Sequence, residues 1–231
     1  MADKLKEKYD CIISLGSTCA PKNYIDNFIG PGETQFFDWL GSSYMWSINS
    51  IIENKWAGIT EPENYKMLYL HRGTIFNPVR SLMTNTKYMM QFLHDATSIK
   101  EIKSPIFTEK YLRRAARFDK RMREAKNILF IRQKGDLSEK HRNRYNWGTI
   151  NPYIKGKPSE AEEVERFIPM IKALYGCQQA TLLYMNDERA GWNEDKTILY
   201  VKCNVDIKFK NSDKVLHQIF TDNKVYEDLV E

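Results

Sequence analysis

Cys19 ends a short segment, Gly16-Ser17-Thr18-Cys19, that follows an apolar run at residues 9–15. The run is typical of a buried parallel strand, and serine and threonine commonly begin a helix. A cysteine at such a strand-to-helix turn lies beside free backbone N–H groups and the positive end of a helix dipole, which favour its thiolate form. The N–H groups from Ser17 to Cys19 could also hold an oxyanion. We therefore interpret Cys19 as a candidate nucleophile; the alternative is a small buried residue that packs under the helix.

A thiol nucleophile needs a base, and the chain has four histidines. His94 ends the apolar run MMQFLHD and is followed by Asp95. It could accept the proton of Cys19, with an aspartate or asparagine to orient its ring. His141, in a polar stretch, and His217, near the end of the chain, are weaker candidates. The alternative for His94 is a surface position or a structural hydrogen bond.

Arg132 closes a second apolar run, NILFIR, at residues 127–132. A guanidinium at the end of a buried strand is costly unless it meets an anion. Two roles follow for it. The arginine either binds a carboxylate or phosphate of a substrate, or it pairs with Asp38 or Asp187.

Four apolar runs alternate with helix patterns, which predicts a mostly parallel sheet of about four to five strands with helices on both faces. The runs lie at residues 9–15, 127–132, 180–185 and 197–203. The expected fold is a Rossmann-like three-layer α/β sandwich, a single domain over residues 1–231 with an inserted lobe near 57–105. Ligands of such sheets bind at the carboxyl ends of the strands, which draws attention to segments 16–19, 132–136, 186–187 and 204–206.

Local signals set the expected helix boundaries. Thr108 is expected to cap a helix that runs to about Ala125, with Tyr111, Leu112, Ala115, Phe118 and Met122 on its apolar face. Ser159 and Glu162 form a capping-box pattern, and Gly176 is the expected stop of that helix. A serine-capped helix is expected within residues 44–56.

Composition narrows the classes of function. The net charge of +5, from 35 basic and 30 acidic residues, is too small for a dedicated nucleic-acid binder but leaves room for an anionic ligand. Aromatic residues make up 13% of the chain, and such residues often line sites for flat or sugar-like ligands. The first ten residues lack an apolar signal core, and no run is long enough to span a membrane, so a cytoplasmic protein is expected.

The four cysteines lack C-x-x-C spacing, which argues against a zinc site and favours free thiols in a reducing compartment. Cys11, Cys177 and Cys203 lie in apolar surroundings and are expected to fill the core. No metal or cofactor is expected. The oligomeric state is left open.

The sequence resembles the DUF1796 family, whose members are labelled papain-like cysteine peptidases and occur in bacteria and large DNA viruses. The matching segments, spread over most of the chain, are YDCIISLGSTC at 9–19, FFDWL at 36–40, HD at 94–95, KYLRRAARFDKR at 110–121 with ILFIR at 128–132, and LLYMN at 182–186. The resemblance implies Cys19 as nucleophile, His94 as base, and Asn186 or Asp95 as the orienting residue. Because GSTC follows a strand, it also looks like the G-D-S entry of SGNH hydrolases, with the sulfur near the place of the serine.

A second resemblance involves residues 130–136, FIRQKGD, which are similar to the H-x-R-x-G-D element of some fucosyltransferases. Here the histidine is absent and the spacing is one residue longer. In those enzymes the arginine holds the diphosphate of the nucleotide sugar, which implies the same role for Arg132.

Three hypotheses follow from the sequence. The leading one is a hydrolase or acyl transferase that uses Cys19 and His94 on a peptide, glycan or small-molecule substrate. The second is a glycosyltransferase or other glycan-modifying enzyme in which Cys19 is structural, and the third is a binding module without catalysis. The expected substrate-binding residues are Gly16, Ser17, Asp38, Trp39, Arg132 and Asp136.

Overall fold

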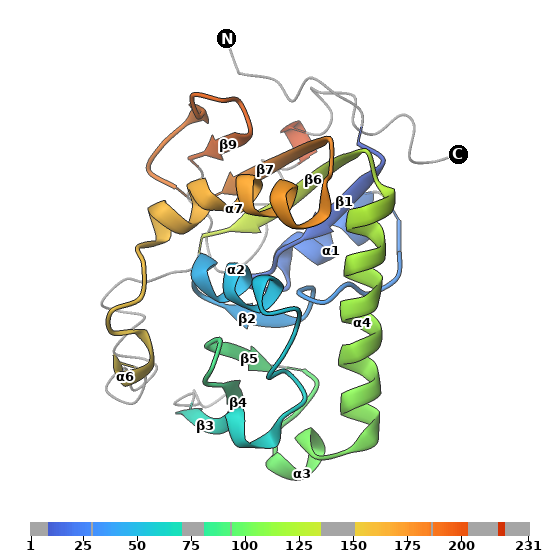
Figure 1. Ribbon diagram of the computed structural model, residues 1–231, viewed down its shortest axis with the longest axis vertical. Helices are drawn as coiled ribbons and strands as arrows, with labels where there is room; N and C mark the ends of the chain where they lie inside the picture. Colours follow the sequence, from blue (N-terminus) through green and yellow to red (C-terminus); the bar gives the residue numbers. More distant parts are fainter. Residues whose placement is uncertain are drawn as a thin grey trace.

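The computed structural model describes residues 9–28, 30–70, 81–92, 94–134, 151–185, 187–202 and 217–219. Several residues singled out in the sequence lie outside these ranges: Asp136, His141, Asn186 and Cys203. Figure 1 shows two sheets, one above the other in that view, with the helices arranged around them.

The larger sheet has five strands in the order β1-β6-β7-β9-β8. Its members are β1 (Cys11–Ser14), β6 (Asn127–Gln133), β7 (Gln179–Met185), β8 (Gly191–Trp192) and β9 (Ile198–Val201). The first four in spatial order are parallel, and only β8 pairs antiparallel, with β9. The predicted mixed α/β fold with a mostly parallel sheet is thus confirmed. The prediction was possible because these strands are continuous apolar runs, as is typical of sheets covered on both faces. The finer expectation, a Rossmann-like three-layer sandwich, stays a prediction.

Side chains from the two faces of this sheet belong to different apolar clusters, because successive residues of a strand point to opposite sides. One cluster joins the sheet to helices α4 (Pro105–Glu124) and α7 (Glu160–Tyr175); from the sheet it contains Ile128, Phe130, Leu182, Tyr184 and Ile198. The other lies with α1 (Ala20–Phe28), which contributes Tyr24; from the sheet it contains Leu129, Ile131, Leu183, Met185 and Leu199.

The smaller sheet is antiparallel, with four strands in the order β2-β5-β4-β3. They are β2 (Leu40–Ser42), β3 (Tyr65–Leu70), β4 (Ser81–Asn85) and β5 (Met90–Phe92). Helix α2 (Met45–Glu53) follows β2 and packs against α7. The shorter helical elements are a 3₁₀ turn at Pro62–Asn64, α3 (Ile99–Ile102) and α6 (Asn151–Ile154).

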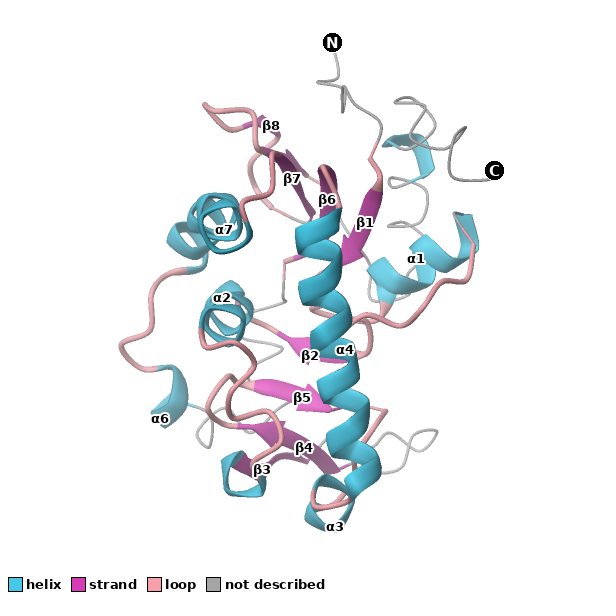
Figure 2. Ribbon diagram, turned by 45° about the vertical axis from the view of Figure 1, so that its right-hand side comes forward, coloured by secondary structure: helices cyan, strands magenta, loops and turns pink. Residues whose placement is uncertain are grey.

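Helix α4 runs alongside both sheets, as Figures 1 and 2 show from two directions. Its apolar face is largely as expected, with Tyr111, Ala115, Phe118 and Met122 buried, but Leu112 is 51% exposed. The expected cap at Thr108 is wrong. Ser104 caps the helix, with its side chain accepting a hydrogen bond from the Phe107 N–H at 3.2 Å.

Of the other predicted helix boundaries, those of α7 are confirmed and the cap of α2 is not. The capping box of Ser159 and Glu162 is confirmed, and Gly176 ends α7 in the left-handed region at φ 69°. The serine cap expected for α2 is wrong, because Tyr44 precedes this helix and makes no side-chain cap bond. Both confirmed signals are specific: the capping box needs two side chains that bond each other's backbone, and the left-handed end of the helix favours glycine.

Candidate functional site

The turn after β1 is held in an uncommon backbone conformation. Gly16 has φ +71° and Ser17 has φ +80°, a backbone region that residues other than glycine rarely adopt. A Cβ atom on Gly16 would lie 2.8 Å from the carbonyl oxygen of Phe37 and 3.3 Å from that of Leu40. The GSTC segment therefore packs directly on the FFDWL segment, and glycine is needed at this point for both its conformation and its size.

Side-chain hydroxyl oxygens accept hydrogen bonds from several backbone N–H groups of this turn. Ser14 Oγ accepts from the Gly16 N–H at 3.1 Å, and Ser42 Oγ accepts from the Ser17 N–H at 3.1 Å. Thr18 Oγ1 accepts from the Ala20 N–H at 3.2 Å. Since the Ser17 N–H already has a partner, the oxyanion donors expected from Ser17 to Cys19 reduce to the N–H groups of Thr18 and Cys19.

Cys19 is half-buried, whereas Cys11 and Cys177 are buried. Its carbonyl accepts the first hydrogen bond of α1, from the Asn23 N–H at 3.0 Å, so the thiol sits at the beginning of the helix as expected. Burial nevertheless raises the pKa of the Cys19 thiol. The expected resting thiolate is therefore wrong: loss of solvent outweighs the stabilisation offered by nearby backbone dipoles.

Arg132 is fully buried and donates to protein groups at the junction of the two sheets. Its Nη1 donates to Leu15 O and Ser42 Oγ, both at 3.2 Å, and its Nη2 donates to Ser42 O at 2.9 Å. Its acidic neighbour is Glu160, with Nη2 and Oε1 3.8 Å apart. Among the described residues it pairs with neither Asp38 nor Asp187, so both expected ion pairs are wrong. Its contacts also give no support to a diphosphate site.

His94 reaches this region through the antiparallel sheet. Leu40 of β2 pairs with Phe92 of β5, and His94 follows two residues later. The exposed imidazole meets the half-buried ring of Trp39 edge to face, with centroids 5.9 Å apart. The FFDWL segment thus contacts both the GSTC turn and His94, although no hydrogen bond joins Cys19 to His94 among the residues that the structure describes.

Asp95 is committed to α4. Its Oδ1 accepts from Lys110 at 3.0 Å, and its Oδ2 accepts from Tyr111 at 2.6 Å and from Arg114 at 2.8 Å. Burial raises the pKa of this carboxyl, but the hydrogen bonds from Tyr111 and Lys110 and the charge of Arg114 outweigh it, so the net shift is downward. An orienting role for Asp95, or for Asn186 outside the described ranges, stays a prediction.

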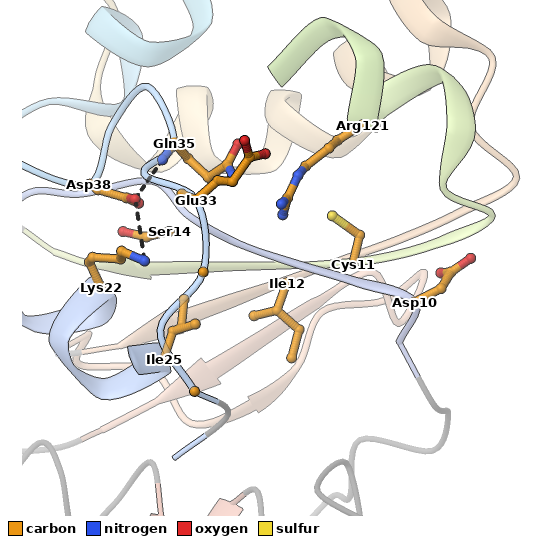
Figure 3. A pocket seen from close by; sticks show the side chains of 12 residues that line it. Asp10, Cys11, Ile12, Ser14, Lys22, Ile25, Glu33, Gln35, Asp38 and Arg121 are labelled. Carbon is orange, nitrogen blue, oxygen red and sulfur yellow. Dashed lines mark hydrogen bonds and ion pairs between the residues drawn. The ribbon is translucent and has the colours of Figure 1, made fainter. Parts of the chain in front are cut away.

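A cleft of about 170 Å³ lies beside β1, between α1, the segment 30–38 and Arg121 of α4. Figure 3 shows Lys22, Gln35 and Asp38 together, with Arg121 directed toward Cys11. Asp38 Oδ2 accepts from the Gln35 N–H at 2.6 Å and lies 3.8 Å from Lys22 Nζ. Burial raises the pKa of Asp38 to about 6, although the Gln35 N–H and the Lys22 charge act in the opposite direction.

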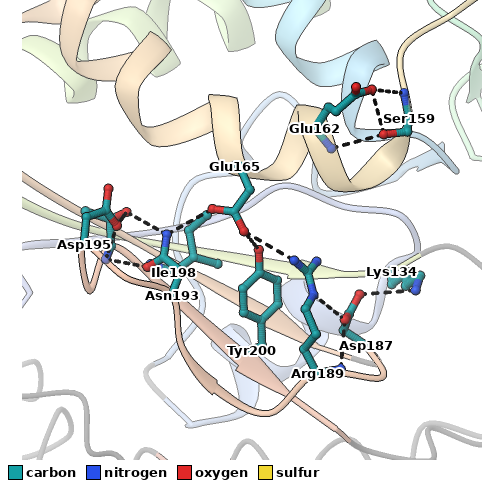
Figure 4. Close-up of polar contacts among 11 residues, drawn as sticks. Lys134, Ser159, Glu162, Glu165, Asp187, Arg189, Asn193, Asp195, Ile198 and Tyr200 are labelled. Carbon is teal, nitrogen blue, oxygen red and sulfur yellow. Dashed lines mark hydrogen bonds and ion pairs between the residues drawn. The ribbon is translucent and has the colours of Figure 1, made fainter.

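A polar network occupies the carboxyl ends of the central strands. Figure 4 shows Asp187 between Lys134 and Arg189. The carboxylate lies 3.2 Å from Lys134 Nζ and 2.8 Å from Arg189 Nε. Burial raises the pKa of Asp187, but hydrogen bonds from Arg189 and Lys134 outweigh this and lower it to about 2. Thr18 Oγ1 donates to Gln133 Oε1 at 3.3 Å, which joins the GSTC segment to the same edge of the sheet.

Within the described ranges, no group of three or more His, Cys, Asp or Glu side chains is placed to hold a metal ion. Over the same ranges, no helix combines the length and apolar character needed to cross a bilayer.

Ser14, Ser42 and Glu160 are site residues that sequence reasoning missed. A serine beside a buried strand carries no pattern of its own, and Glu160 lies on a helix far along the chain from Arg132. The one available signal was Arg132 itself, because a buried guanidinium requires an acidic partner somewhere.

Comparison with known proteins supports the expected relationship. No match is found among curated proteins, and none among solved structures. The family model described as "Putative papain-like cysteine peptidase (DUF1796)" matches residues 10–145, which is more than half of the chain and includes the turn, Cys19, His94 and Arg132. The chain therefore belongs to the DUF1796 family.

Proposed function

We propose that this protein is a cysteine-dependent hydrolase or acyl transferase in which Cys19 is the nucleophile and His94 the general base. One observation carries the proposal: Cys19 is partly exposed at a turn whose backbone is held by buried contacts, while Cys11 and Cys177 are buried. Membership of a family described as papain-like cysteine peptidases supports the same reaction class.

In the proposed reaction, His94 removes the thiol proton and the sulfur of Cys19 attacks the acyl carbon of the substrate. A carbon–sulfur bond forms, and the bond to the leaving group breaks as the imidazolium returns the proton to that group. Water, or an acceptor nucleophile in a transferase, then attacks the thioester and releases the acyl group and the thiol. A base is needed because burial raises the thiol pKa, which leaves little thiolate at neutral pH.

Groups around the turn would complete the site. The N–H groups of Thr18 and Cys19 would face the developing oxyanion, because the N–H groups of Gly16 and Ser17 already donate to serine hydroxyls. Trp39, half-buried beside His94, would contact the substrate. The substrate itself is proposed at the level of a peptide, an ester or an acylated glycan.

Two measurements test this function. The protein is labelled with an iodoacetamide probe, and each cysteine-containing peptide is quantified by mass spectrometry; Cys19 should react before Cys11 and Cys177 because it is more exposed. A panel of p-nitrophenyl esters and peptide amides is then assayed. Cys19→Ser should abolish turnover, and His94→Ala should reduce it by about 10²–10⁴-fold, the usual contribution of a general base.

Matched variants separate the site from general effects. Cys177→Ser removes a buried thiol, and His217→Ala removes another exposed histidine; both should retain turnover. Loss of labelling and turnover in Cys11→Ser or Cys203→Ser, with Cys19→Ser unaffected, would place the nucleophile elsewhere and refute the proposal.

A further inference from the structure

We propose that Ser42 is a positioning residue: its hydroxyl holds the Ser17 backbone and thereby sets the placement of the Cys19 sulfur. Ser42 ends β2 in the antiparallel sheet, whereas Ser17 and Cys19 follow β1 in the parallel sheet. The catalytic meaning of this role rests on the proposed function, but the placement itself does not.

The contacts of Ser42 use both lone pairs of its hydroxyl oxygen. Oγ accepts from the Ser17 N–H at 3.1 Å and from Arg132 Nη1 at 3.2 Å, and the side chain is fully buried. The carbonyl of the same residue accepts from Arg132 Nη2 at 2.9 Å. Loss of the hydroxyl would leave two buried donors without this acceptor, one in the turn and one in the guanidinium.

The backbone of Ser17 needs such a contact. A serine at φ +80° lies in a region that L-residues occupy only when their surroundings hold them there. The Gly16 N–H bond to Ser14 fixes one side of the turn, and the Ser17 N–H bond to Ser42 fixes the other. Without Ser42, Ser17 can relax toward an ordinary conformation, and Cys19, two residues later, would move with it.

Arg132 strengthens this arrangement from behind. Its Nη1 donates both to Ser42 Oγ and to Leu15 O, the carbonyl just before the turn, so one guanidinium contacts both sides of the junction. Glu160, at 3.8 Å, supplies the compensating charge. The fully buried arginine thus orients the serine hydroxyl, and this hydroxyl holds the backbone of Ser17.

The test compares Ser42→Ala with Ser47→Ala. Ser47 is also fully buried, lies close by in α2, and its Oγ has no hydrogen-bond partner among the described residues, so the same atom is removed without touching the turn. The rate of iodoacetamide labelling at the Cys19 peptide is measured as a function of pH in the full-length protein.

In Ser42→Ala the turn loosens and the thiol becomes more exposed. Its labelling rate at neutral pH should rise by about fivefold, on the scale of one lost hydrogen bond, and the midpoint of the pH profile should move downward. Ser47→Ala should keep the wild-type profile at Cys19, and labelling of Cys11 should be unchanged in both variants.

A second measurement covers the case in which Ser42→Ala does not fold. In the wild-type protein, the Ser17 amide should exchange slowly with deuterium because its N–H is bonded to a buried hydroxyl. Rapid exchange of this amide, or a Cys19 pH profile that is identical in Ser42→Ala and Ser47→Ala, would overturn the positioning role.

The two proposals fail separately. If Cys19 turns over no substrate in the wild-type protein but its pH profile shifts in Ser42→Ala, the positioning role stands and the hydrolase does not. If Cys19 is the nucleophile but its profile and the kcat of Ser42→Ala match those of Ser47→Ala, the hydrolase stands and the positioning role is wrong.

Discussion

The two ends of β1 each lead to a cysteine, yet they differ in what surrounds the sulfur. At the first end, Cys11 is buried within the strand, pairs with Ile128 and has Arg121 beside it. At the second, Cys19 is half-buried beyond the strand, in the turn held by Ser14 and Ser42.

Acidity does not distinguish these two thiols, because burial raises the pKa of both. The difference lies in the backbone. Cys11 belongs to a strand whose peptide groups pair within the sheet, whereas Cys19 lies beyond the end of the strand, at the beginning of α1. The position of a cysteine relative to the sheet is therefore a better guide to a candidate nucleophile than its resting pKa.

The largest expected effect comes from removing the support of the Cys19 end. Arg132→Ala should lower the free energy of unfolding by about 3–5 kcal/mol, because it removes the positive charge beside Glu160 and the buried donor to the carbonyls of Leu15 and Ser42. Urea denaturation measures this. Arg166→Ala, which removes a partly exposed guanidinium paired with Glu53 and Glu163, should cost much less; equal costs would show that Arg132 is not a special support.

Asp38 lies between the two ends of β1: it lines the cleft near Cys11, and its neighbour Phe37 contacts Gly16. Its folded pKa of about 6 exceeds the ordinary value of 3.8, so the folded protein holds the proton more tightly. The resulting stabilisation is complete below about pH 4 and is lost as the pH rises through about 6.

Asp38→Asn should remove this dependence. Between pH 4 and pH 7, the unfolding free energy of the wild-type protein should fall relative to the variant by about 2 kcal/mol, since one pKa unit corresponds to about 1.4 kcal/mol and the unfolded carboxyl is already partly ionised at pH 4. Denaturant titrations at several pH values give the difference. Parallel curves for the two proteins would mean that Asp38 is ionised at an ordinary pKa and that the cleft is more hydrated than its burial indicates.

Gly16→Ala should cost about 1–3 kcal/mol, because the residue has φ +71° and the added Cβ would meet a backbone carbonyl at 2.8 Å. Gly32→Ala is the matched control, since a Cβ there meets nothing within 4 Å. Thermal unfolding of both variants, together with labelling at each cysteine, should show that Gly16→Ala alters Cys19 and leaves Cys11 unchanged. An equal response at both thiols would contradict the separation of the two ends.

The smallest effect is expected at the first end. Cys11→Ser should destabilise the protein by about 1 kcal/mol, the cost of placing a hydroxyl in a largely apolar buried position. The rate of labelling at Cys19 and any turnover should be retained. A loss of turnover in this variant would transfer the proposed chemistry to the cleft beside Arg121.

Much of the larger sheet could be predicted from the sequence because its strands are continuous apolar runs, each followed by a clear change to polar residues. The smaller sheet was harder, since its strands are short and its first strand, β2, is three residues long. The predicted cap at Thr108 is wrong because Pro105 occupies the first helical position, which is the signal that favours Ser104 as the cap.

The candidate site was predictable only in part. Cys19 could be found because a strand, a glycine and a helix start follow one another in the chain. The position of His94 beside Trp39 depends on the pairing of Leu40 with Phe92, a contact between distant segments that no local pattern encodes. The true surroundings of Arg132 depend on Ser42 and Glu160, which come from two further elements.

The hydrogen bonds from Arg132 and Ser17 to Ser42 have a mechanical consequence. Ser42 belongs to one sheet and Leu15 to the other, and the same guanidinium contacts both. A hinge rotation between the sheets would have to separate these water-excluded partners together, so the antiparallel lobe and the cysteine turn should move as one body. Any opening of the protein to admit a bulky molecule would then have to come from the surrounding loops.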